Sequence, residues 1–138
     1  MLLKRMVCLA FVLASSMFAL AESAKPIPAG ARIYVAPMNG FETYLIAALD
    51  KKKVPVVVVT DRDKADFEIT GASESEKAGW AKIMFSHSTQ STEQASINVH
   101  NIKTGAVVFA YAVNKSNSVH GKQSTAEACA KHLKDKVE

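Results

Sequence analysis

Residues 32–60 read RIYVAPMNGFETYLIAALDKKKVPVVVVT, and this stretch decides the fold. It begins with a short β-prone segment, residues 32–37, which Pro37 ends. A helical stretch follows, and then comes a run of β-branched residues from Val54 to Thr60, typical of a strand buried on both faces. Strand, helix and strand in this order predict two parallel strands joined by a right-handed crossover.

The helix in the middle of this stretch shows a start signal, a stop signal and an apolar face. Asn39 and Glu42 are spaced as in a capping box. Residues 51–53 are three lysines that suit the negative end of a helix, and Pro55 prevents continuation. We interpret these lysines as an exposed helix end and not as a basic binding patch. The apolar face consists of Phe41, Tyr44, Leu45, Ala48 and Leu49.

Three more strands are expected after this unit. A charged turn at residues 61–64 leads into an alternating segment at residues 66–76, and a second alternating segment covers residues 95–100. A turn at residues 103–105 then joins the latter to a β-prone run at residues 107–113, which predicts a hairpin. We therefore predict an α+β domain with a mixed sheet of four to five strands. Two helices pack on one face of this sheet, in the order β-α-β-β-β-β-α.

The second helix is predicted near the C-terminus. Ser124 and Glu127 have the spacing of another capping box, which places the helix start at Ser124. Cys129 falls in the middle of the apolar face, so we interpret it as a buried small apolar residue and not as a reactive thiol. That face consists of Ala126, Cys129, Ala130, Leu133 and Val137.

The first 21 residues have the three parts of a secretory signal peptide. Lys4 and Arg5 supply positive charge, an apolar run follows, and residues 19–21 (Ala-Leu-Ala) match the pattern accepted by signal peptidase. Residues 22–31 then read as a flexible lead-in, and residues 32–138 as a single α/β domain. The expected location is the periplasm or the extracellular space, with no membrane span after cleavage.

Removal of the signal lowers the formal charge from +4 to +2, because Lys4 and Arg5 leave with it. Such a weakly charged domain has no electrostatic reason to bind nucleic acid. Cys129 is the one cysteine left after cleavage, so no internal disulfide is expected.

The sequence contains no clear catalytic or metal-binding motif, so we expect no enzyme activity, no cofactor and no metal site. No pair of histidines has a metal-ligand spacing, and residues 121–125 (GKQST) lack the first glycine of a phosphate-binding loop. An enzyme site assembled from loop residues such as His87 or His120 stays open as a third hypothesis.

Two groups of residues are candidates for binding. An anion could bind at the start of the last helix, near Lys122, Ser124 and Thr125, and this is the basis of a second hypothesis, a small-molecule or anion carrier that uses residues 114–125. An apolar group precedes a serine-rich loop and is either core or a partner surface: Trp80, Ile83, Met84 and Phe85.

Four segments resemble a small α/β domain of bacterial envelope proteins: residues 32–37 (RIYVAP), the helix from Asn39, residues 56–71 (VVVVTDRDKADFEITG) and residues 101–111 (NIKTGAVVFAY). The domain is that of curli-secretion channel proteins, lipoprotein activators of cell-wall synthases and the N-terminal part of the Tol-Pal translocation protein. This chain lacks a lipobox cysteine and a pore-forming insertion, and no functional residues carry over. The resemblance implies an exported, non-catalytic binding or assembly module whose partner is an envelope protein of unknown identity.

Overall fold

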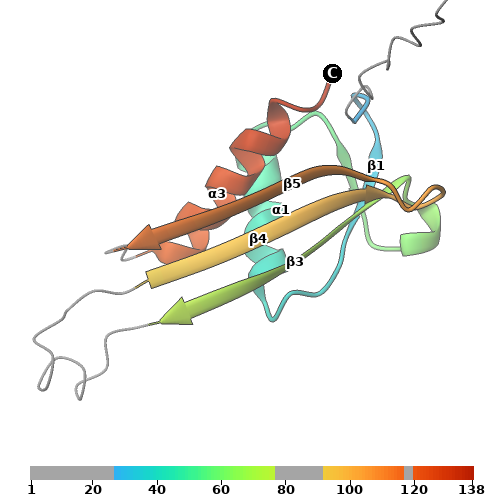
Figure 1. The fold of residues 1–138 in the computed structure, drawn as a ribbon. Helices are drawn as coiled ribbons and strands as arrows, with labels where there is room; N and C mark the ends of the chain where they lie inside the picture. Colours follow the sequence, from blue (N-terminus) through green and yellow to red (C-terminus); the bar gives the residue numbers. More distant parts are fainter. Residues whose placement is uncertain (1–26, 77–91, 117–119) are drawn as a thin grey trace, which may run out of the picture.

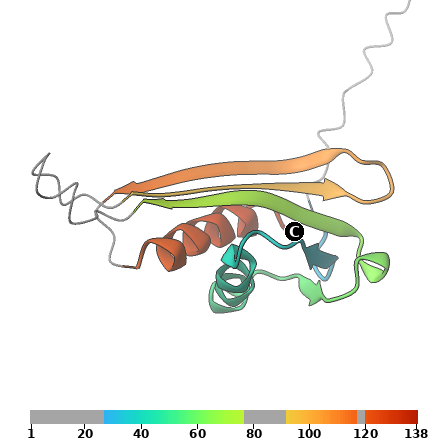
Figure 2. The same ribbon diagram turned by 90° about the horizontal axis from the view of Figure 1, so that it is seen from below.

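The computed structural model describes residues 27–76, 92–116 and 120–138. These residues form a five-stranded sheet with two helices on one face, which confirms the predicted fold class and element order (Figures 1 and 2). The elements are β1 (Arg32–Val35), α1 (Phe41–Lys51), β2 (Val57–Val59), the 3-10 turn η1 (Arg62–Lys64), β3 (Phe67–Glu76), β4 (Thr92–Asn101), β5 (Val107–Ser116) and α3 (Gly121–Lys134).

The strand order across the sheet is β2-β1-β3-β4-β5. β1 is parallel to both β2 and β3, which confirms the parallel pairing expected from the strand–helix–strand unit. β3, β4 and β5 are antiparallel, and each is ten residues long. The sheet therefore has a broad antiparallel half, and the two helices lie beneath it in Figure 2.

The core lies between the sheet and the helices. Alternation along each strand sends every second side chain toward the helices, and the stripes on α1 and α3 meet them there. Cys129 is fully buried in this layer, which confirms the interpretation of this residue as core. The largest fully buried side chains are Ile27, Ile33, Phe41, Leu45, Leu49, Ile69, Ile97, Val99 and Leu133.

Two expectations about apolar residues are wrong. β2 is a short edge strand and not a strand buried on both faces: it covers three residues, and the side chain of Val57 is 51% exposed. Val57 pairs with Arg32 and shares its face, opposite the buried Ile33, and no described element covers this face. Tyr44 was expected in the core stripe of α1 but is 45% exposed, because it lies at the border of that stripe.

The start of α1 follows the capping box in part. Glu42 reaches back as predicted, and its Oε2 accepts from the backbone N–H of Met38 at 2.7 Å and of Gly40 at 2.9 Å. The N-cap residue is Gly40, with φ of 87°, and no side chain caps this helix. Asn39 itself has φ of 55°, so it belongs to the turn before the helix.

The predicted capping box of α3 is wrong. The helix begins at Gly121, three residues before Ser124, with His120 as N-cap. The side chain of Glu127 consequently does not cap a backbone N–H of the N-cap residue but reaches Lys51 and Lys52 at the end of α1.

The segment before β1 also differs from the expected flexible lead-in where it is described. Ile27 is fully buried and forms a parallel bridge with Val137. Its N–H donates to Lys136 O at 3.0 Å, and its carbonyl accepts from Glu138 N–H at 3.1 Å. Residues 22–26, like the signal peptide expected at residues 1–21, lie outside the described residues.

Candidate functional site

The three residues of the predicted anion site do not form one site. Thr125 is 1% exposed, and its hydroxyl lies 2.9 Å from Gly121 O and 3.0 Å from Lys122 O, the helix carbonyls to which it donates. The backbone N–H of Ser124 donates to His120 O at 2.9 Å. Because the helix begins earlier than expected, Ser124 and Thr125 lie within its first turns and not at its start. Lys122 is partly exposed and does not form an anion site with them.

The predicted partner surface of Trp80, Ile83, Met84 and Phe85 lies outside the described residues, as does His87. The other three histidines are divided between β4 and the last helix. His100 is on β4, His120 precedes α3, and the ring of His132 stacks on Tyr111 with centroids 4.3 Å apart. The structure thus does not bring His100, His120 and His132 together as one constellation.

The face of the sheet opposite the helices is not covered by any described element (Figure 2). The register places one side chain from each long strand in every row of this face. Thr70, Asn98 and Ala110 form one row, and Ala72, Ser96 and Ala112 form the next row. These side chains are short, so the backbone of the three strands is within reach of an approaching surface.

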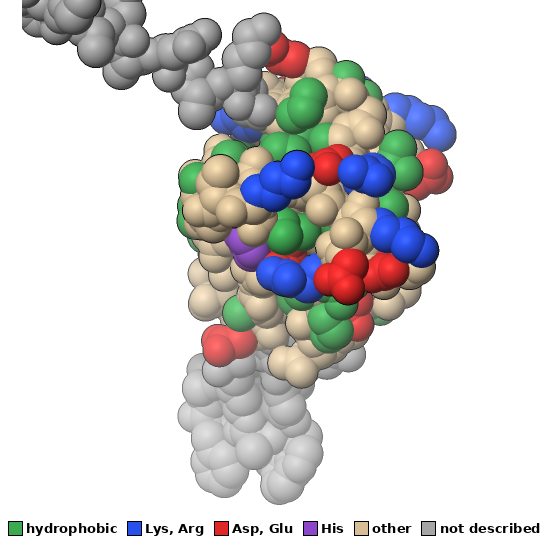
Figure 3. All heavy atoms as spheres, turned by 90° about the vertical axis from the view of Figure 1, so that its right-hand side faces the viewer, with side chains coloured by type: hydrophobic (Ala, Val, Ile, Leu, Met, Phe, Trp, Pro, Cys, Tyr) green, Lys and Arg blue, Asp and Glu red, His purple; other side chains and the backbone are tan. Residues whose placement is uncertain are grey.

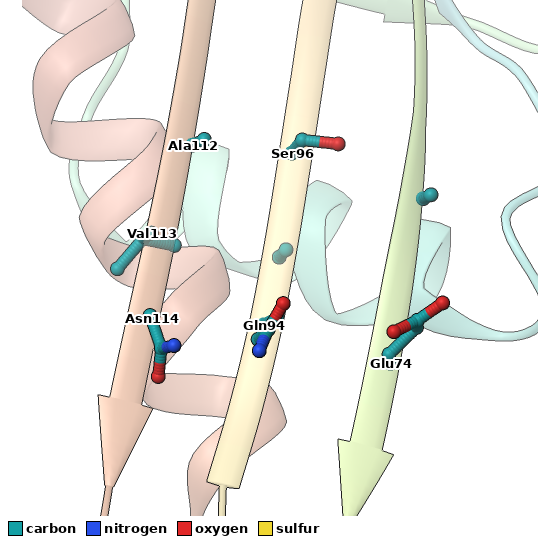
Figure 4. Close-up of a pocket in the computed structure, with 8 residues that line it drawn as sticks. Glu74, Gln94, Ser96, Ala112, Val113 and Asn114 are labelled. Atoms are coloured by element: carbon teal, nitrogen blue, oxygen red, sulfur yellow. The ribbon is translucent and has the colours of Figure 1, made fainter.

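A shallow depression of about 400 Å³ lies on this open face. Ala72, Ser96 and Ala112 form part of its floor. Glu74, Gln94 and Asn114 stand in the next row, one on each strand, and Figure 4 shows them side by side across the sheet. A carboxylate and two amides in one row provide acceptors and donors for hydrogen bonds on a rigid platform.

A charged cluster that the sequence did not suggest lies at the other end of the same face. Oε2 of Glu68 accepts from Arg62 Nε at 2.9 Å and lies 3.0 Å from His100 Nε2. Glu68 is only 8% exposed although it carries a charge. The Arg62 hydrogen bond is the largest cause that lowers the pKa of Glu68, and it outweighs burial, which acts in the opposite direction; His100 adds to the lowering.

This cluster belongs to the end of the molecule that carries η1 and the β4–β5 turn. Basic and acidic side chains are intermixed over that end in Figure 3. Arg32 and Asp66 form a second ion pair there, with 2.9 Å between Arg32 Nη2 and Asp66 Oδ1. Because the charges are paired, we interpret the Glu68 cluster as a structural clamp between η1, β3 and β4.

The described residues contain no group of three or more His, Cys, Asp or Glu side chains placed to hold a metal ion. Within the same residues, neither helix is both long and apolar enough to span a membrane.

No protein-family model matches this chain, and no curated protein matches it. Solved structures do. PelC from Paraburkholderia phytofirmans, a dodecamer, superposes with a TM-score of 0.58 at 16% identity, over 82% of this chain and 92% of PelC. A point variant of PelC gives a TM-score of 0.61 at 13% identity, over 79% of this chain and 90% of the variant.

TolB from Acinetobacter baumannii superposes with a TM-score of 0.51 at 10% identity, over 80% of this chain and 29% of TolB. The chain therefore spans less than a third of TolB. The expected resemblance to the small α/β domain of envelope proteins, the Tol-Pal translocation protein among them, is confirmed. At these identities the likeness shows the fold.

Proposed function

We propose that this chain is an exported, non-catalytic module of the bacterial envelope that binds a protein partner with the open face of its sheet. The observation that carries the proposal is the depression at Ala72, Ser96 and Ala112, beside the row of Glu74, Gln94 and Asn114. All six side chains stand on β3, β4 and β5, which fix their spacing before any partner arrives.

The chemistry of this surface suits a peptide segment of a partner protein. The small side chains on the floor of the depression allow a partner backbone to approach closely. The row of one carboxylate and two amides complements the N–H and C=O groups of that backbone. Side chains that rigid strands hold in place lose little conformational freedom on binding, which favours affinity. We therefore expect a polar loop or extended segment to lie across the three strands.

The comparisons support an assembly role in one respect. PelC is a dodecamer, so a domain of this fold serves in a larger assembly there. A second copy of this chain is accordingly one candidate for the partner, and another envelope protein is the alternative. The signal-like residues 1–21 support export, and we expect the mature protein to begin at Glu22. N-terminal sequencing of the protein from a periplasmic fraction checks this cleavage point.

A photo-crosslinking amino acid at position 112 tests the binding surface. Ala112 is exposed on the open face, whereas Thr43 is exposed on α1 and provides the matched control position. Crosslinking in living cells should give a discrete adduct from position 112 and none from position 43. An adduct with the mass of two copies identifies self-assembly, and any other discrete adduct identifies a different partner.

The affinity of the isolated pair then gives a quantitative test. Ala112→Arg should weaken binding by about tenfold or more, because a long charged side chain fills the depression. Thr43→Arg should leave the affinity unchanged. Equal crosslinking from both positions, or an unchanged affinity in Ala112→Arg, would contradict the proposal.

A further inference from the structure

A second hollow lies on the opposite side of β5, between this strand and α3. Its volume is about 560 Å³, within the range of small-molecule sites. We call it the β5–α3 groove. The residues that line it are Lys52, Tyr111, Val113, Lys115, His120, Gln123, Ser124, Glu127, Ala128, Lys131 and His132.

The groove carries an excess of positive charge. Lys52, Lys115 and Lys131 line it, and Glu127 is the one acidic residue among the lining residues. Both oxygens of Glu127 are already used: Oε1 accepts from Lys51 Nζ at 2.6 Å, and Oε2 lies 3.2 Å from Lys52 Nζ. In the described part of the chain, Lys115 and Lys131 form no ion pair. Their ammonium groups are therefore available to an anionic ligand.

These two lysines lie at opposite ends of the groove. Lys115 is the cross-strand neighbour of Glu93, which is buried beneath Gly121 at the start of α3 and does not line the groove. Lys131 lies next to His132, whose ring stacks on Tyr111. From Lys115 to Tyr111, strand β5 rises by about 13 Å, at about 3.3 Å per residue. The groove thus has two basic ends separated by about 13 Å.

One side of the middle of the groove is apolar. Val113 of β5 and Ala128 of α3 form this side between the two basic ends, and Gln123, Ser124 and Glu127 add polar groups beside it. At one end, the stacked rings of Tyr111 and His132 extend this apolar surface. An apolar ligand body is therefore favoured along Val113 and Ala128, and a charged group is favoured at each end.

From this layout we infer that the β5–α3 groove binds an elongated organic dianion whose two acidic groups lie about 13 Å apart at the ends of an apolar body. Lys115 holds one acidic group, and Lys131 holds the other. This inference is independent of the proposed protein-binding function, because the groove lies on the helix side of β5 and the depression lies on its open face.

Isothermal titration calorimetry at low ionic strength tests the inference, with sebacate as the probe. Sebacate has two carboxylates at the ends of a ten-carbon chain. Succinate keeps both charges but shortens the body, and octanoate keeps an apolar body but has one charge. We expect saturable 1:1 binding of sebacate that is at least about tenfold tighter than binding of either comparison ligand.

Variants of the two lysines locate the site. Lys115→Gln and Lys131→Gln should each weaken sebacate binding by about tenfold, and the double variant should abolish it. Lys103→Gln, in the exposed β4–β5 turn, is the matched control and should bind as the parent protein does. Lys115→Arg keeps the charge and should retain binding, which separates charge from packing.

Three results would overturn the inference: no saturable binding of sebacate, equal affinities for sebacate, succinate and octanoate, or full affinity in the folded double variant. If sebacate does not bind but position 112 still crosslinks, the groove inference fails and the protein-binding proposal is unaffected. If sebacate binds but position 112 does not crosslink, the protein-binding proposal fails and the groove inference is unaffected.

Discussion

Glu127 of α3 lies 2.6 Å from the ammonium of Lys51 at the end of α1, so one carboxylate joins the two helices that lie side by side on the sheet (Figure 1). Gln123 donates to the same oxygen at 2.9 Å, and Lys52 lies 3.2 Å from the other oxygen. These contacts lower the pKa of Glu127 to about 2, and the hydrogen bond from Lys51 makes the largest contribution.

The low pKa of Glu127 makes stability depend on pH in the acid range. The contribution of this carboxylate is fully present above its ordinary pKa of 4.5 and is lost as the pH falls through about 2. Melting temperatures measured across this range should therefore fall less in Glu127→Gln than in the parent protein. Asp50→Asn, on the exposed side of α1, serves as the control. If the melting temperatures of Glu127→Gln and the parent fall equally with pH, the assignment is contradicted.

Removal of the charge on Glu68 should destabilise the fold. In Glu68→Gln, the guanidinium of Arg62 and the ring of His100 lose their shared carboxylate partner, and we expect a loss of about 1–2 kcal/mol in the free energy of unfolding. Urea denaturation measures this loss. Glu74→Gln, an exposed position on the same strand, should change stability by less than about 0.5 kcal/mol. Similar losses in both variants would show that Glu68 is not a clamp.

A methyl group at position 121 should also be destabilising. A Cβ on Gly121 would lie 1.8 Å from Cγ of Glu93, which is buried beneath it. Glycine to alanine ordinarily stabilises a helix, so an expected loss of about 1–3 kcal/mol reverses the usual sign. Thermal unfolding of Gly121→Ala checks this, and adding Glu93→Ala should recover part of the loss. A stabilised single variant would disprove the close packing.

The thiol of Cys129 should be unreactive in the folded protein. Burial raises its pKa to about 11, so almost no thiolate exists at neutral pH. Ellman's reagent should modify the mature native protein slowly and the urea-unfolded protein rapidly. Equal rates in the two states would mean that the last helix opens readily.

Much of the fold could be predicted because local patterns specify it. Apolar spacing on α1 and α3 and alternation on β3 and β4 identified four core elements. Residues at the margin of a pattern were less certain: Tyr44 has the helical spacing of the core stripe but lies at its edge. The run of valines at residues 56–59 predicted burial on both faces, whereas the helices cover one face of the sheet and Val57 points to the other. A sheet position is set by the whole topology and not by local composition.

The candidate surfaces could be predicted much less well, because they depend on which strands are neighbours and in which register. Glu68 and His100 meet because β3 pairs with β4, and their separation along the chain gives no indication of this contact. Lys115 and Lys131 share a groove because α3 packs against β5. One usable signal was present: Glu68 and His100 both fall on the polar side of an alternating strand.

The bridge between Ile27 and Val137 brings the two outer ends of the folded domain to one point. A short peptide linker could therefore join residue 138 to residue 27, and the chain could be reopened in the β4–β5 turn at Gly105 without moving any layer of the structure. Circularly permuted variants should therefore fold to the same sheet, although their strands are synthesised in a different order.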